Sequence, residues 1–134
     1  MTMITPSTFL RRALLLDAAC CLLLGLLMAV CAAPLGWWVH LPLALLREAG
    51  LFLLAFGVLL AWLGTRPVLP RWAVLGIIAG NALWAIDSVL LLLPGWIAPN
   101  MLGGAFILAQ AIATALIAEL EYAGLRRSAA AAMA

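Results

Sequence analysis

Residues 11–34 read RRALLLDAACCLLLGLLMAVCAAP and decide the fold of the chain. Two arginines precede a long run in which leucine, alanine and cysteine dominate, and a proline ends it. A helix needs about 20 apolar residues to cross a hydrocarbon core of about 30 Å. Three later stretches meet the same requirement. The sequence therefore predicts four membrane spans, at about 13–33, 43–64, 72–93 and 101–121.

The composition agrees with a membrane protein. Of the 134 residues, 69% are hydrophobic and only 9% are charged, whereas soluble domains are about half apolar and a quarter charged. So few ionisable side chains cannot cover the surface of a soluble globule. A net charge of +2 with no basic stripe also excludes nucleic acid as a partner. The expected partner is the lipid bilayer.

Turn-forming residues separate the four spans. The breaks are Pro34-Leu35-Gly36, Gly64-Thr65-Arg66-Pro67 and Pro94-Gly95. Connections this short make neighbouring helices antiparallel. The fold class predicted is all-α: a single domain over residues 1–134, an up-down-up-down bundle of four transmembrane helices without a sheet. The alanine-rich residues 128–134 are expected to fray.

The arginines predict how the chain is oriented. The chain has no lysine, and six of its seven arginines fall on one side if the helices alternate: Arg11, Arg12, Arg66, Arg71, Arg126 and Arg127. Only Arg47 lies toward the other side. Because positive charge stays cytoplasmic, both termini are expected in the cytoplasm. The resulting expectation is a multi-pass protein of the bacterial inner membrane.

Small residues repeat at helical spacing within the spans. In lipid, such residues let helix backbones approach closely. The first span carries Gly25 and Ala29, the second carries Gly50 and Gly57, and Gly76 and Gly80 form a GxxxG motif in the third. We expect all of these faces to pack inside the bundle, with a dedicated dimer face at the GxxxG as the alternative.

Charged residues enter the second and third spans from the outer side. Arg47, Glu48 and Asp87 lie at nearly the same depth, and ionisable groups inside a span need a partner or a function. One interpretation is an Arg47–Asp87 ion pair that ties two helices together. The other is an outward-facing polar pocket for an anionic or zwitterionic small molecule, or for a proton relay. The pocket residues would be Arg47, Glu48, Asp87, Trp84 and Ser88, with His40 at the mouth. A third possibility is that these side chains face a missing protein partner.

Polar residues also occur deeper in the spans. Asn81 and Gln110 are expected to meet near the midplane as an amide pair that joins two helices. Together with Thr114, they could instead line a narrow path between the outer charges and the inner acids. On the inner side, we expect the arginines to neutralise Asp17, Glu119 and Glu121 at the headgroup boundary. Asp17 alone could also bind a proton or a cation.

The cysteines allow a weak metal hypothesis. Cys20, Cys21 and Cys31 contain no CxxC motif, and small packing residues are the first interpretation. The adjacent pair Cys20-Cys21 resembles the small bacterial mercuric-ion transport proteins, in which such a pair accepts the ion. That resemblance would make the two cysteines a soft-metal site. With His40 as the single histidine, no haem or zinc site is expected, and no cofactor.

The whole chain resembles the small bacterial four-helix membrane proteins of the DoxX-like kind. The residues behind this resemblance are Gly80-Asn81-Ala82-Leu83-Trp84, Ala109-Gln110-Ala111 and Glu119-Leu120-Glu121. It implies the fold and a bacterial inner membrane. No enzyme motif occurs. The leading functional hypothesis is a non-enzymatic accessory, assembly or oligomerising subunit, with a homo-oligomer or another membrane protein as its partner. The alternative is a small transporter or ligand-binding protein that uses Arg47, Glu48 and Asp87.

Overall fold

The computed structural model describes residues 2–131, and helices account for most of them. In chain order the elements are β1 (Met3–Ile4), α1 (Thr8–Val30), α2 (Ala32–Val39), α3 (Leu43–Gly64), β2 (Leu69–Pro70), α4 (Arg71–Leu90) and α5 (Met101–Ala131). Four of these, α1, α3, α4 and α5, are long and apolar enough to cross a membrane. The expectation of four apolar spanning helices is confirmed.

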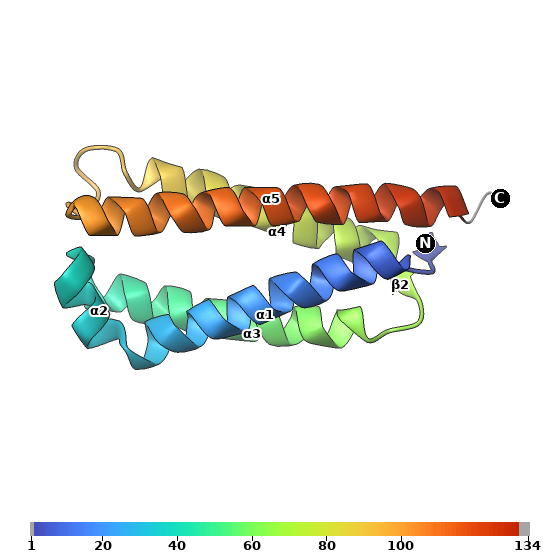
Figure 1. The fold of residues 1–134 in the computed structure, drawn as a ribbon, viewed down its shortest axis with the longest axis horizontal. Coiled ribbons are helices and arrows are strands. Elements are labelled where there is room, and N and C mark those ends of the chain that lie inside the picture. The colour runs from blue at the N-terminus through green and yellow to red at the C-terminus, as the bar shows by residue number, and fades with distance from the viewer. Residues whose placement is uncertain (1, 132–134) are drawn as a thin grey trace.

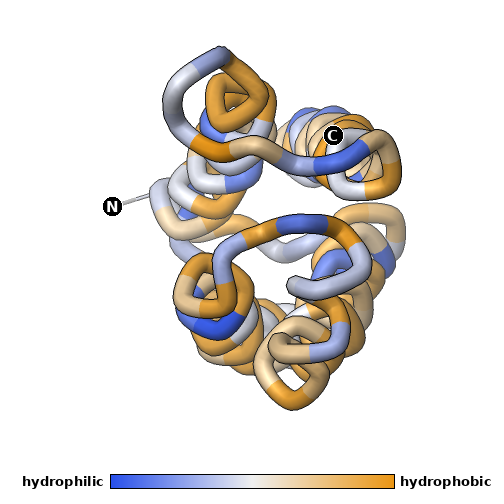
Figure 2. Tube along the Cα trace, turned by 90° about the vertical axis from the view of Figure 1, so that its left-hand side faces the viewer, coloured by the Kyte–Doolittle hydropathy of each residue, from blue (hydrophilic) through white to orange (hydrophobic). Residues whose placement is uncertain are grey.

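The long helices alternate in direction, so the described N- and C-terminal segments lie at the same end of the bundle (Figure 1). We call this the arginine end, because it carries Arg11, Arg12, Arg66, Arg71, Arg126 and Arg127. Helix α2 and the loop between α4 and α5 lie at the opposite end (Figure 1). Seen from that opposite end, hydrophobic residues dominate every long helix (Figure 2).

Glycines hold α1 and α3 together. A Cβ atom on Gly25 would lie 2.8 Å from the carbonyl oxygen of Gly50, and one on Gly50 would lie 2.6 Å from the backbone nitrogen of Ala29. Real Cβ atoms do not come this close to backbone, so the two helices fit only because both positions lack a side chain. The expected small-residue packing is confirmed for this pair of helices.

The GxxxG motif behaves differently. A Cβ atom on Gly76 or Gly80 would meet nothing within 4 Å. The expectation that this motif packs inside the bundle is therefore wrong for residues 2–131. The physical reason is that α4 packs chiefly against α5 and contacts α3 only sparsely, so the glycine face of α4 has no close neighbour.

Two short features at the ends of α1 were not expected. A helix, α2, forms where the sequence predicted a break at Pro34. The proline lies in the first turn of this helix, where a missing backbone N–H costs no hydrogen bond. The left-handed conformation of His40, with φ of 53°, ends this helix. At the other end, Met3–Ile4 pairs with Leu69–Pro70 as a two-stranded antiparallel sheet. The expectation of no sheet is wrong to this small extent.

The last turns of α5 are tied to the start of α1. The Ser128 hydroxyl accepts a hydrogen bond from the Ser7 backbone N–H at 2.9 Å and donates to the Gly124 carbonyl at 2.8 Å. The Ser7 hydroxyl in turn caps α1 by accepting from the Leu10 N–H. Contrary to the expected fraying from residue 128, the helix continues to Ala131. The rest of that tail, 132–134, lies outside the described residues.

The bundle consists of two helix pairs. Helix α1 packs most closely on α3, and α4 packs most closely on α5. The two pairs meet mainly along α1 and α5, whereas α3 and α4 are less closely packed. This uneven packing leaves cavities between the pairs, and the polar side chains of the interior lie around them.

Candidate functional site

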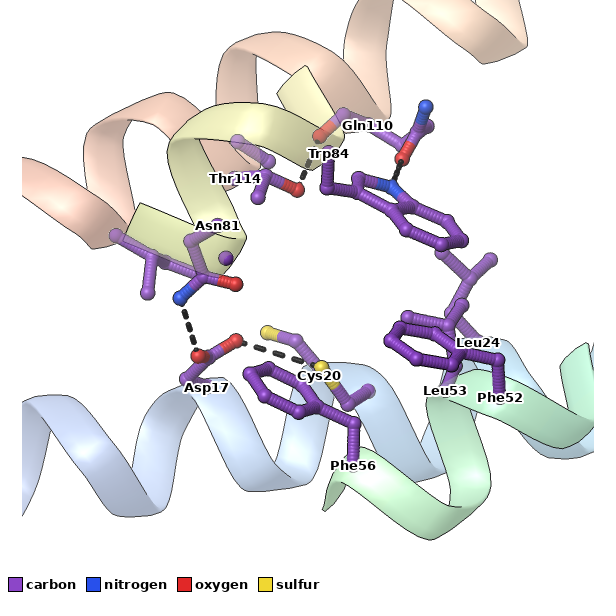
Figure 3. A pocket seen from close by; sticks show the side chains of 14 residues that line it. Asp17, Cys20, Leu24, Phe52, Leu53, Phe56, Asn81, Trp84, Gln110 and Thr114 are labelled. Carbon is purple, nitrogen blue, oxygen red and sulfur yellow. Dashed lines mark hydrogen bonds between the residues drawn. The ribbon is translucent and has the colours of Figure 1, made fainter. Parts of the chain in front are cut away.

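Two carboxyl groups and an amide meet inside the bundle. Asp17 from α1, Asn81 from α4 and Glu121 from α5 have exposed fractions of 2%, 3% and 0%. The Asn81 amide nitrogen donates to Asp17 Oδ2 at 2.6 Å and to Glu121 Oε2 at 3.1 Å. Figure 3 shows the first of these hydrogen bonds. We call these three residues the carboxyl–amide cluster.

The remaining carboxyl oxygens of the cluster differ in their partners. The Cys21 thiol donates to Asp17 Oδ1, with the sulfur 3.4 Å away. Glu121 Oε1 is buried and has no hydrogen-bond partner in the described part of the chain. The donors around the two carboxyl groups are thus a single amide and a thiol, and no ion pair compensates either acid within residues 2–131.

The arginines do not reach the cluster, so the expected neutralisation of Asp17 and Glu121 is wrong. At 1.5 Å per residue, the two acids lie about 7–8 Å deeper along their helices than Arg12 and Arg126. Other arginines are engaged at the surface: the Arg11 guanidinium donates to the Gly64 carbonyl at 2.7 Å.

Two more arginines lie on aromatic rings. The guanidinium carbons of Arg66 and Arg127 lie 4.3 Å from the ring centroids of Trp62 and Phe9. Of the three inner acids, only Glu119 has an exposed side chain, although it lies two residues farther from Arg126 than Glu121 does.

Depth along the helices explains why these residues meet. Asp17, Asn81 and Glu121 each lie about 14–15 Å from the arginine end of their own helix. The helix bounds predicted from the sequence did not show this equal depth, because α1 begins before residue 13 and α5 continues past residue 121. Asn81 therefore pairs with the two acids, and the expected Asn81–Gln110 amide pair does not form.

The chemistry of the cluster follows from its burial. Two carboxylates close together in apolar surroundings cannot both be ionised without a compensating cation. Asn81 can donate only two hydrogens, and both are already used. The arrangement is therefore suited to hold a proton between two acids, as carboxyl pairs in enzymes do.

A small cavity of about 100 Å³ borders the cluster. Asp17, Cys20 and Asn81 line one side of it, and Trp84, Gln110 and Thr114 line the other (Figure 3). This inner cavity is large enough for several water molecules, since one water needs about 10–15 Å³ by the same measure. It can connect the cluster to the polar residues nearer the opposite end.

Gln110 organises those polar residues. Its side-chain oxygen accepts from the Trp84 indole N–H at 2.7 Å, and its nitrogen donates to the Ser88 hydroxyl at 2.7 Å. The Thr114 hydroxyl donates to the Gln110 backbone carbonyl. The predicted midplane residues Asn81, Gln110 and Thr114 all line the inner cavity, which agrees with the second arrangement that the sequence suggested.

A larger cavity of about 350 Å³ lies toward the opposite end of the bundle. Four of the six predicted pocket residues line this outer cavity: Glu48, Trp84, Asp87 and Ser88. Arg47 and His40 do not. The acids are the only charged lining residues, so the cavity favours a cation, whereas the sequence suggested an anionic or zwitterionic ligand.

Arg47 and His40, which do not line the outer cavity, lie elsewhere. Arg47 and Asp87 are both exposed and form no ion pair with each other. His40 borders a separate shallow depression with Trp37, Trp38 and Leu102. The ion-pair interpretation is therefore wrong, and Arg47 does not neutralise Asp87.

Aromatic rings separate the two cavities. Phe52 of α3 stacks on Trp84 of α4, with ring centroids 5.7 Å apart and planes 6° from parallel. Both residues, together with Gln110, line both cavities. Sequence reasoning missed Phe52. The signal that could have found it is the pair Phe52 and Phe56, one turn apart on a helix that also carries Glu48.

The cysteines give no support to a soft-metal site. All three are free thiols, with Cys21 buried and Cys20 exposed at the wall of the inner cavity. Within residues 2–131 no group of three or more histidine, cysteine, aspartate or glutamate side chains is arranged to hold a metal ion.

Comparisons with known proteins found no match: no family model, no curated protein and no solved structure is similar to this chain. The case for a function rests on the site itself.

Proposed function

We propose that this chain is a small proton-coupled transporter of the bacterial inner membrane that carries a small cationic compound. The observation that supports this most directly is the carboxyl–amide cluster, in which Asp17 and Glu121 are buried without a basic partner within residues 2–131 and Asp17 lines the inner cavity. Ionisable residues inside membrane spans are costly, and they mark proton relays and substrate paths.

A purely structural role accounts for the cluster less well. Asn81 alone could join helices through hydrogen bonds to neutral partners, at a lower cost than two buried acids. The unpartnered oxygen of Glu121 adds a further cost that packing does not offset. A proton that is taken up and released at this position gives both acids a use.

The orientation of the transporter follows from the arginines. Six of them lie at one end, and the positive-inside rule supports a cytoplasmic position for that end and for both termini. The outer cavity then opens toward the periplasm. A cation would enter between Glu48 and Asp87, and protons would reach the cluster past Gln110 and Thr114 through the inner cavity.

The proton site can be tested without knowing the substrate. Proteoliposomes adsorbed on a solid-supported membrane are exposed to a rapid pH jump, and the displaced charge is recorded. Protons that move from water into the buried cluster cross part of the membrane, so the wild type should give a transient current. Asp17→Asn combined with Glu121→Gln should abolish most of it.

The matched control is Glu119→Gln. It removes the same kind of charge from the same helix, but at an exposed position, and should leave the current unchanged. A wild-type current no larger than that of the double variant would overturn the proposal. Circular dichroism of each variant shows whether the bundle is intact.

A second candidate function is the accessory or assembly subunit that the composition suggested. The observation that favours it is the open space beside the exposed Gly76, where a partner helix could approach α4. Purification from native membranes in mild detergent tests this role. A stoichiometric membrane protein that co-elutes supports it, and a chain that elutes alone contradicts it.

A further inference from the structure

A groove opens on the side of the bundle between α3 and α4, near the arginine end. It has a volume of about 590 Å³, within the range of ligand-binding pockets. Its walls include Phe56, Leu59 and Trp62 of α3 and Trp72, Gly76 and Ile77 of α4. We call it the lateral groove. It does not include the carboxyl–amide cluster, and nothing about it depends on the transport proposal.

The lateral groove exists because two helices that face each other do not pack closely. Contacts between α3 and α4 are sparse, and a Cβ on Gly76 would find no atom within 4 Å. Both helices have the length and hydropathy of membrane spans. The groove therefore faces the hydrocarbon region and is open to acyl chains from the side.

One charged residue lines the lateral groove. Arg66 lies beyond the last residue of α3, at the arginine end, and its guanidinium carbon sits 4.3 Å from the centroid of the Trp62 ring. The side chain is exposed, so its remaining N–H donors can bind another group. An apolar channel with a cation at its headgroup end matches an amphipathic anion that lies along the helices.

We propose that the lateral groove binds an anionic phospholipid. Its phosphate would contact Arg66, and one acyl chain would lie between Trp62 and Ile77 over the open position at Gly76. Basic pockets between membrane helices recognise anionic headgroups in this way. A second copy of this chain is the less suitable occupant, since the same arginine would repel the arginine end of a neighbouring copy.

Native mass spectrometry provides the test. The protein is purified in mild detergent and titrated with phosphatidylglycerol or phosphatidylcholine of identical acyl chains. The wild type should bind phosphatidylglycerol about fivefold more tightly, the difference expected for one arginine near an anionic group. Arg66→Gln should make the two affinities equal. Gly76→Phe should fill the groove and weaken the binding of both lipids.

Two matched controls separate the site from general effects. Arg12→Gln removes an exposed arginine at the same end that does not line the groove. Gly104→Phe adds the same ring at a glycine with equal open space outside the groove. Both should bind lipid as the wild type does.

Three results would overturn the proposal. The first is equal affinity of the wild type for the two lipids, and the second is the same preference in Arg66→Gln as in Arg12→Gln. The third is a protein dimer that Gly76→Phe dissolves while lipid binding is unchanged, because that result would assign the groove to a second copy.

Discussion

Replacing Asn81 with leucine should destabilise the bundle, because the two buried carboxyl groups would lose their shared donor. Leucine has the same number of side-chain heavy atoms as asparagine and is bulkier, so the change leaves no cavity. It removes hydrogen bonds of 2.6 and 3.1 Å to Asp17 and Glu121. Hydrogen bonds to charged groups contribute about 1.5–3 kcal/mol each in soluble proteins, and those between membrane helices average about 0.6 kcal/mol.

The burial of the carboxyl–amide cluster determines where the loss of stability falls between these two values per hydrogen bond. Glu121 is fully buried and already has one unpartnered oxygen, so its second oxygen cannot turn to water. We therefore expect Asn81→Leu to lower the free energy of unfolding by about 2–4 kcal/mol. Titration with sodium dodecyl sulfate in mixed micelles, followed by circular dichroism, measures this quantity.

A second variant identifies the cause of the loss. If carboxyl groups left without a donor are responsible, Glu121→Leu in the Asn81→Leu background should recover part of the stability, because one of these groups is then absent. An Asn81→Leu protein within about 0.5 kcal/mol of the wild type would refute the reasoning. So would a double variant in which the two losses simply add.

Three further predictions test the packing, the outer cavity and the tie between the chain ends. Gly50→Ala should lower the free energy of unfolding by about 1–3 kcal/mol, because its Cβ would clash with the backbone of α1, while Gly80→Ala should be neutral in the same titration. Glu48→Gln should weaken binding of the tetraphenylphosphonium cation in isothermal titration calorimetry, and Arg47→Gln should not, because Glu48 lines the outer cavity and Arg47 does not. Equal effects of the two substitutions on the affinity would contradict this assignment. Ser128→Ala should cost about 1 kcal/mol and speed hydrogen exchange at the Ser7 amide, which loses its acceptor; unchanged exchange there would be evidence against the tie.

Sequence reasoning predicted the four spanning helices well, because hydropathy alone carries that information. The glycine contact between Gly25 and Gly50 was also predictable, since four-residue spacing fixes a helix face. The helix at Ala32–Val39 was not, because Pro34 disrupts a helix interior but not a first turn. Whether Pro34 falls in the interior or in the first turn depends on where the previous helix ends.

The candidate site shows why depth is hard to read from sequence. Each member of the carboxyl–amide cluster was named as a polar residue of a span, but Asn81 was assigned to Gln110, and Asp17 and Glu121 to the arginines. Both errors arose because Asp17 and Glu121 were placed too close to the surface: their helices were predicted too short at the arginine end, by five residues in α1 and ten residues in α5. Errors of that size move a residue by about 7–15 Å along the axis, which is enough to choose the wrong partner.

Arg47 illustrates a second limit. Its depth agreed with that of Asp87, yet both side chains are exposed, and Asp87 borders the outer cavity without it. Depth can be counted along a helix, but the rotation of two helices about their axes depends on packing. Here the glycine contact between α1 and α3 sets the rotation of α3. The prediction placed Arg47 on the face of Gly50 and pointed it into the bundle, but its side chain is exposed.

The two helix pairs meet mainly along α1 and α5, so these two helices would act as the hinge of any rotation between the pairs. Rotation about this line would widen the gap between α3 and α4, and the stacked rings of Phe52 and Trp84 would be the first contact to separate. Asp17 and Glu121 lie on the hinge helices themselves and would move least. An acyl chain bound in the lateral groove would keep α3 and α4 apart. The thickness and charge of the surrounding bilayer, which affect lipid binding, would then influence the width of the outer cavity.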